Sequence, residues 1–204
     1  MSRLRMIVWG VTAVVALALA IAAGARAFGG SGSDDSLPVL FTVQPFALID
    51  HDGQPFTDRT LRGHPYIASF VFTSCKTICP MITSQQANVS RHLADARAIR
   101  FVSITVDPEQ DTPPVLRAYA ERHHADLSRW SFLTGEPALV RRTIEGGLLQ
   151  PVGEREAGTD GAYDIVHTGR LLLVDGEGRA RGLYTLTTEQ LLQLERDARS
   201  LLRE

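Results

Sequence analysis

The sequence has only two cysteines, Cys75 and Cys79, among 204 residues. Two are too few for a disulfide-stapled scaffold, an iron–sulfur cluster or a zinc site of four cysteines. An excess of basic residues is also missing, because 21 lysines and arginines stand against 23 acidic residues. No nucleic-acid partner is therefore expected. Apolar residues reach 44%, which excludes a disordered chain, and the length suits one domain with a short appendage.

One long apolar run is present, because residues 6–25 carry no charge, with arginines on both sides. Twenty helical residues at about 1.5 Å each span the roughly 30 Å of bilayer hydrocarbon. The run predicts a transmembrane anchor, and the arginines that precede it predict a cytoplasmic stub over residues 1–5. The alternative is a signal peptide that is cleaved near Ala25-Arg26-Ala27, but signal-peptide apolar regions are usually shorter. Both interpretations place the remaining chain across the membrane.

Beyond this run, the chain divides into a tether and one domain. Residues 26–40 are rich in Gly, Ser and Asp, which is typical of a flexible linker. From residue 41 to residue 204, buried-strand patterns alternate with amphipathic-helix patterns. This alternation predicts an α/β fold with a central mixed sheet and helices on both of its faces, a three-layer sandwich.

Local patterns place the individual strands. Short hydrophobic runs bounded by turn residues predict strands, and the glycine-rich stretch 146–161 predicts a loop. The segments 165–174 and 179–184 are expected to form a hairpin. The expected strands are Phe46–Ile49, Pro55–Thr57, Tyr66–Phe72, Phe101–Val106, Ser131–Leu133, Ile165–Val174 and Arg179–Tyr184.

Helical periodicity places four helices. The first helix is expected to begin at Pro80, where the missing N–H costs nothing. The last helix is expected to begin at a capping box formed by Thr187 and Gln190. A third covers Pro137–Ile144. The inner face of the remaining helix is expected to hold Val115, Leu116, Tyr119, Ala120 and His123, and that of the last helix Leu191, Leu194, Ala198, Leu201 and Leu202.

The two cysteines lie at a strand-to-helix junction, four positions apart. The exposed N–H groups and the positive dipole end of a helix favour thiolate, the form that binds metal or attacks a disulfide. A purely structural disulfide is a weaker explanation, because so short a loop would stabilise the fold by only roughly 2 kcal/mol. Metal binding, redox exchange or both remain. Two thiolates suit soft metals, and copper(I) and zinc both qualify.

A third ligand would decide between these metals, and six histidines are available. His167 lies where a loop enters a strand, on a segment expected to fall beside the cysteines. It is therefore the candidate for an imidazole ligand. The others have positions typical of structural or exposed residues, namely His51, His64, His92, His123 and His124.

Three separated motifs resemble the Sco/SenC family. The first is Phe72-Thr73-Ser74-Cys75, with Cys79-Pro80 after three residues. The second is Val106-Asp107-Pro108-Glu109-Gln110-Asp111-Thr112-Pro113, and the third is Val166-His167-Thr168, where His167 lies eight residues before Asp175. Their order and spacing agree with the family from about Phe46 to the C-terminus.

The resemblance implies a thioredoxin-like domain, anchored in the inner membrane by a single span, on the periplasmic side. Members of the family are copper chaperones for cytochrome c oxidase assembly. They deliver copper to the binuclear centre of subunit II or keep its cysteines reduced. By position, Cys75, Cys79 and His167 would be the copper ligands. A copper donor chaperone and a thioredoxin-like reductase are further expected partners, and no enzymatic turnover is implied.

Two features depart from the pattern or leave a choice open. Lys76-Thr77-Ile78 replaces the usual Pro-Asp-Val or Pro-Asp-Ile spacer, which exchanges an acid for the only lysine in the chain. A cation there favours thiolate but disfavours cationic copper. Asp107 and Asp164 are candidates for orienting the site, although a turn or a solvated carboxylate explains them equally well.

The main rival is an exported thiol–disulfide oxidoreductase that uses Cys75 and Cys79. Such enzymes usually have two residues between their cysteines and a proline just before the facing strand. This chain has three residues there, and Gly169 stands at the place of the proline. A tethered interaction domain with incidental cysteines is the remaining alternative, and it leaves the cysteine pair unexplained.

Overall fold

The computed structural model describes residues 9, 37–76, 78–157, 163–167 and 169–203. The chain divides into two units, Met1–Ser36 and Leu37–Glu204. The predicted anchor over 6–25, the stub and most of the tether lie outside the described residues. Among the residues that are described, no helix has both the length and the apolar character needed to cross a membrane.

The described strands form a large mixed sheet and a separate hairpin. The sheet has the order β1-β10-β9-β4-β5-β6-β2-β3, and β4, β5 and β6 are parallel neighbours at its centre. The hairpin pairs β7 with β8. The strands are β1 (Phe41–Thr42), β2 (Ala47–Asp50), β3 (Pro55–Thr57), β4 (Tyr66–Val71), β5 (Arg100–Thr105), β6 (Trp130–Thr134), β7 (Val152–Ala157), β8 (Tyr163–His167), β9 (Leu171–Val174) and β10 (Arg179–Tyr184).

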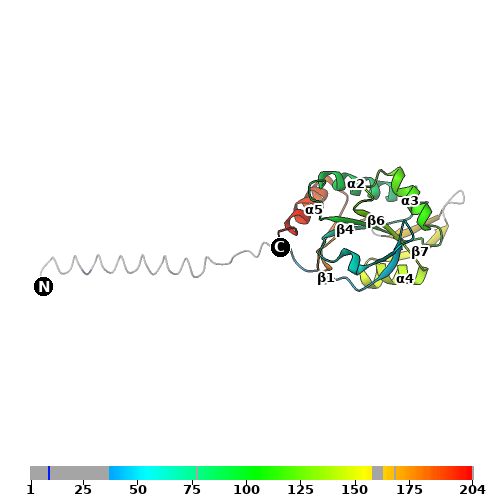
Figure 1. Cartoon of the computed structure of the whole chain (residues 1–204), viewed down its shortest axis with the longest axis horizontal. Helices are drawn as coiled ribbons and strands as arrows, with labels where there is room; N and C mark the ends of the chain where they lie inside the picture. The colour runs from blue at the N-terminus through cyan, green and yellow to red at the C-terminus, as the bar shows by residue number, and fades with distance from the viewer. Residues whose placement is uncertain (1–8, 10–36, 77, 158–162, 168, 204) are drawn as a thin grey trace. The chain divides into compact units, whose positions relative to one another are not determined.

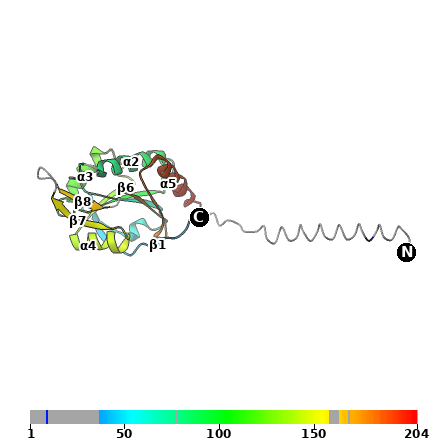
Figure 2. The same ribbon diagram turned by 180° about the vertical axis from the view of Figure 1, so that it is seen from behind.

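Helices cover both faces of the sheet. Figure 1 shows α2, α3 and α5 along one face and α4 on the other, and the reverse view in Figure 2 agrees. This arrangement confirms the predicted α/β sandwich. The helices are η1 (Asp58–Leu61), α2 (Ile78–His92), α3 (Pro113–Arg122), α4 (Pro137–Arg141), the π-helical η2 (Arg142–Gly147) and α5 (Thr188–Ser200).

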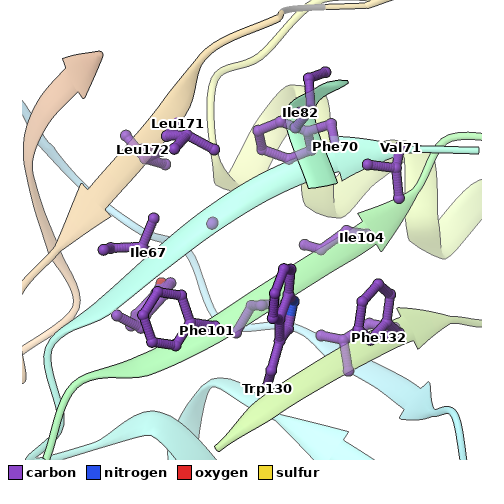
Figure 3. Packing of buried hydrophobic residues seen from close by; sticks show 14 of the residues in the cluster. Ile67, Phe70, Val71, Ile82, Phe101, Ile104, Trp130, Phe132, Leu171 and Leu172 are labelled. Carbon is purple, nitrogen blue, oxygen red and sulfur yellow. The ribbon is translucent and has the colours of Figure 1, made fainter. Parts of the chain in front are cut away.

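The core lies on the central strands, whose apolar runs are buried on both faces. All six residues of β4 are buried, as are all four of β9. Figure 3 shows Phe101 on β5 beside Trp130 on β6, and their ring centroids are 5.8 Å apart. Because both faces of the central sheet are covered, the nearly continuous hydrophobic run over residues 66–72 predicted β4 correctly.

The segment 146–171 differs most from the sequence-based prediction. The expected loop over 146–161 contains β7, and the expected strand over 165–174 is two strands, β8 and β9, in different sheets. The polar sequence of β7 (Val-Gly-Glu-Arg-Glu-Ala) has no hydrophobic alternation that would reveal a strand. The sequence-based prediction had joined Ile165 and Val166 to the apolar run 171–174, although the residues between them are polar or glycine.

Helix details also need correction. The helix that was expected to open at Pro80 is α2, which begins at Ile78, so Pro80 is its third residue and still lies within the turn that lacks N–H partners. Val115 and Leu202 were expected to face inward, but they are 38% and 40% exposed. Thr187 does cap α5 by accepting the N–H of Gln190.

Candidate metal centre

The topology brings two loops together at the carboxyl edge of the sheet. β4 and β5 run parallel in register, from Tyr66 opposite Arg100 to Val71 opposite Thr105. The loops that leave them therefore begin side by side. The first leads into α2 and carries the cysteines, and the second carries Asp107 and Asp111. The cysteine motif and the aspartate motif, which are more than 25 residues apart in the sequence, thus lie side by side in the fold.

Both cysteine side chains are buried. Cys79 is fully buried and Cys75 is 7% exposed. The backbone N–H of Cys79 donates to the sulfur of Cys75 at 3.4 Å, and that of Phe72 donates to the sulfur of Cys79 at 3.4 Å. Backbone donors directed at sulfur favour the thiolate form. The sequence-based placement at a helix mouth is therefore correct.

The ring of His167 reaches this pair from the hairpin. Its Nε2 lies 3.5 Å from the sulfur of Cys79. Its Nδ1 is 2.7 Å from the carbonyl oxygen of Ile165, which only accepts, so Nδ1 carries the proton. In a neutral ring, Nε2 then keeps its lone pair and faces the sulfur. A backbone carbonyl that fixes the tautomer in this way is typical of imidazoles that ligate metals.

The donor set suits a soft metal. Two sulfurs and one imidazole nitrogen are the ligands that copper(I) prefers, and they also tolerate copper(II). Within the described part of the chain, no group of three or more His, Cys, Asp or Glu side chains already stands in position to hold an ion. The predicted ligands are thus neighbours rather than a finished coordination shell.

Asp111 fastens the cysteine loop, a role that the sequence analysis did not assign. The carboxylate is fully buried. It accepts the hydroxyl of Thr73 at 2.5 Å, the backbone N–H of Thr73 and, at 2.5 Å, the hydroxyl of Thr105. Burial raises its pKa despite these hydrogen bonds. The sequence did contain a signal for this role, because Asp111 is a second aspartate, four residues after Asp107, in the loop that follows a buried strand.

Asp107 is neither a solvated carboxylate nor only a turn residue. It is 2% exposed and accepts hydrogen bonds from Arg155 on β7 and from the hydroxyl of Tyr163 on β8. Tyr163 in turn accepts the hydroxyl of Ser74 at 2.7 Å. The sequence analysis singled out Asp107 but missed Tyr163. The backbone of Asp164 pairs with β7 opposite Glu156, and its side chain lies outside the described features.

The spacer between the cysteines contacts the opposite loop. Lys76 is exposed, Thr77 is not described, and Ile78 is partly buried. A Cβ atom at Gly169 would lie 2.8 Å from Cδ1 of Ile78, so the place where redox enzymes carry proline is filled here by the spacer. Glycine at this position therefore permits close contact between the loop after β8 and the cysteine helix.

The other histidines make different contacts. His51 is buried and accepts the backbone N–H of Phe132, and burial lowers its pKa. His92 pairs with Glu195 at 2.7 Å, and the ring of His123 lies 4.4 Å from that of Tyr119. These contacts agree with the structural roles expected for them.

Comparison with known proteins identifies the family. The sequence profile of the SCO1/SenC family matches residues 35–202. The chain belongs to the SCO1/SenC family. A SCO1 protein homolog from Bacillus subtilis strain 168 is 30% identical over 154 residues, which are 75% of this chain and 77% of that protein.

Two solved structures show how closely the fold follows this family. Bradyrhizobium japonicum ScoI with copper bound is 29% identical, has a TM-score of 0.67, and matches 79% of this chain and 98% of its own. BsSco is described as having a disulfide switch and as a member of the Sco family of cytochrome c oxidase assembly proteins. It is 24% identical with a TM-score of 0.68 over 81% of this chain and 96% of its own, a likeness in fold. The thioredoxin-like fold is thus confirmed.

Proposed function

We propose that this protein carries copper for the assembly of cytochrome c oxidase, with Cys75, Cys79 and His167 as the ligands. The observation that supports this most directly is the lone-pair nitrogen of His167, 3.5 Å from the sulfur of Cys79. A bare redox pair needs no imidazole with its tautomer fixed toward the sulfur. A copper-bound relative at 29% identity supports the choice of metal.

The proposed chemistry is ligand exchange. A shell of two thiolates and one imidazole leaves room for an incoming ligand from the acceptor, so copper passes without being released to solvent. The proposed acceptor is the binuclear copper centre of cytochrome c oxidase subunit II. This protein would deliver copper to that centre or keep its cysteines reduced. A copper donor chaperone and a thioredoxin-like reductase complete the proposed set of partners.

The proposed location follows from the sequence. Residues 6–25 would anchor the chain in the inner membrane by one span, and the copper-binding domain would lie on the periplasmic side. The arginines before the apolar run support this orientation.

A second candidate is thiol–disulfide exchange by Cys75 and Cys79. The supporting observation is the backbone N–H of Cys79 directed at the sulfur of Cys75, the more exposed of the two cysteines. Exchange requires a reactive, accessible thiolate, and Cys75 is the one that fits this role.

Anaerobic titration separates the two functions. We expect the reduced full-length protein to bind one copper(I) per chain and the protein with an oxidised Cys75–Cys79 pair to bind none, because sulfurs joined in a disulfide are no longer thiolates. The measurement is competition against a chromophoric copper(I) chelator. Absence of copper uptake together with rapid reduction of insulin disulfides would instead establish the oxidoreductase.

His167→Ala is expected to weaken copper(II) binding by more than about 100-fold, since even outer-shell partners of metal ligands are worth about 10–100-fold. Copper(I) binding should change much less, because thiolates dominate the affinity for the softer ion. Parallel titrations with both oxidation states measure this difference. His92→Ala, an exposed histidine paired with Glu195, is the control. Equal losses for both ions would contradict the assigned role.

A further inference from the structure

The imidazole of His167 stands on a hairpin that lies outside the main sheet. β7 and β8 form a two-stranded sheet of their own, outside the main sheet, and His167 is the last residue of β8. An isolated two-stranded hairpin is only marginally stable in water. The position of the ring therefore depends on whatever holds the hairpin to the domain.

Close packing does not hold the whole hairpin. A cavity of about 390 Å³ lies against β7, lined by Val152 and Arg155 on one side and by Val140 and Ile144 on the other. Asp107 and Ile165 also line it. Ile165 of β8 is buried in the core, but on the side of this cavity the hairpin is also held by polar side-chain contacts.

One buried carboxylate supplies such contacts to both strands. Asp107 accepts a hydrogen bond at Oδ1 from Arg155 on β7 and at Oδ2 from the hydroxyl of Tyr163 on β8. The guanidinium of Arg155 also lies over the ring of Tyr163, 4.6 Å from its centroid. Hydrogen bonds to an ionised partner are about twice as strong as neutral ones.

The same tyrosine contacts the loop that carries the cysteines. Its hydroxyl accepts the hydrogen bond from Ser74, the residue before Cys75. Its ring stacks on that of Phe72, with centroids 5.9 Å apart, and the ring of Phe72 also contacts that of His167 in a T-shaped arrangement, with centroids 5.7 Å apart. Tyr163 thus touches the structures that carry all three proposed ligands.

We propose that Tyr163 is a positioning residue for copper, which ties the β7–β8 hairpin to Asp107 and Ser74 and so holds the imidazole of His167 against the thiols. This inference rests on the proposed function. Tyr163 contacts no copper itself and acts through His167. Burial, and then its hydrogen bond to Asp107, raise the pKa of Tyr163, so the hydroxyl remains a donor at neutral pH.

The test is Tyr163→Phe in the full-length protein, with Tyr184→Phe as its matched control. Tyr184 also donates its hydroxyl to an aspartate, Asp197 at 2.7 Å, but it lies on β10 and contacts α5. Each variant therefore loses one tyrosine–aspartate hydrogen bond and keeps its ring. Copper(II) affinity, the sulfur-to-copper(II) charge-transfer spectrum and backbone hydrogen exchange of β7 and β8 without metal are compared.

We expect Tyr163→Phe to lower copper(II) affinity by about 10–100-fold, the range for outer-shell partners of metal ligands, and to alter the charge-transfer spectrum. Copper(I) stoichiometry should stay at one, and hairpin exchange should accelerate. Tyr184→Phe should show none of these changes. Wild-type copper(II) affinity and unchanged exchange in Tyr163→Phe would overturn the inference. If the wild type itself bound no copper, the proposed function would fail, while exchange would still report whether Tyr163 fastens the hairpin.

Discussion

Cys79→Ser is expected to remove copper(I) binding, with a loss of affinity of more than about 100-fold. Loss of an outer-shell partner alone costs about 10–100-fold, and this substitution removes a proposed ligand. Serine has nearly the same size as cysteine, so the buried position stays filled. Its hard oxygen is a poor ligand for copper(I), however, which prefers sulfur.

The position of Cys79 makes this the most damaging of the ligand substitutions. Its sulfur is fully buried, receives the N–H of Phe72 and contacts the ring of His167. No water is available at this depth to take the place of the lost donor. Copper(I) competition titration under anaerobic conditions measures the effect.

Val89→Thr is the matched control for a new buried hydroxyl. Val89 is also buried on α2, ten residues after Cys79. This variant should bind one copper(I) with the affinity of the wild type, and circular dichroism should show that both variants are folded. Wild-type copper(I) affinity in Cys79→Ser would show that the proposed ligand set is wrong.

Asp175→Ala is expected to lower the free energy of unfolding by about 3–5 kcal/mol, the usual cost of breaking a buried ion pair. The carboxylate binds the guanidinium of Arg181 at 2.7 Å, and both side chains are buried. It also accepts the N–H groups of Glu177 and Arg179 in the β9–β10 turn. Arg181 in turn donates to the carbonyl oxygen of Leu37, so the loss extends to the first residue of the compact unit.

The loss of unfolding free energy caused by Asp175→Ala should depend on pH. Burial acts to raise the pKa of Asp175, but the N–H of Arg179 and the guanidinium groups of Arg181 and Arg179 together lower it below its ordinary value. A lowered pKa in the folded state means that the ionised carboxylate stabilises the fold. This contribution is present above the ordinary aspartate pKa of about 3.9 and is lost as the pH falls through the lower pKa of the folded state.

Urea denaturation at neutral pH and at decreasing acidic pH measures both effects. Asp95→Ala is the control, because Asp95 pairs with Arg199 at 2.8 Å but is 71% exposed, and the free energy of unfolding should barely change. A loss below about 1 kcal/mol in Asp175→Ala, or a penalty independent of pH, would show that the buried pair does not stabilise the fold in this way.

Most of the main sheet was predictable from local patterns. Buried strands such as β4 and β9 consist almost entirely of apolar residues, with Ser69 as the one polar residue of β4, and turn residues mark the hairpins β2–β3 and β9–β10. These features depend on residues that are close in the sequence. The hairpin β7–β8 was not predicted, because its strands pair only with each other and alternating hydrophobicity does not mark them.

The proposed site was predictable in composition but not in construction. Spacing at a strand-to-helix junction identified Cys75 and Cys79, the position of His167 at the entry to a strand made it a candidate, and the family motifs then supported all three. The sequence showed no reason for Asp107 and Tyr163 to act together, because 56 positions separate them. In the structure their side chains share a hydrogen bond.

By itself, the sequence determined the α/β class and the family, because hydrophobic periodicity and short motifs are local properties of the chain. Only the tertiary structure decided which nitrogen of His167 faces the sulfur and which carboxylate holds the hairpin. These features depend on distances between segments that meet only when parallel strands align and a separate hairpin folds back over them.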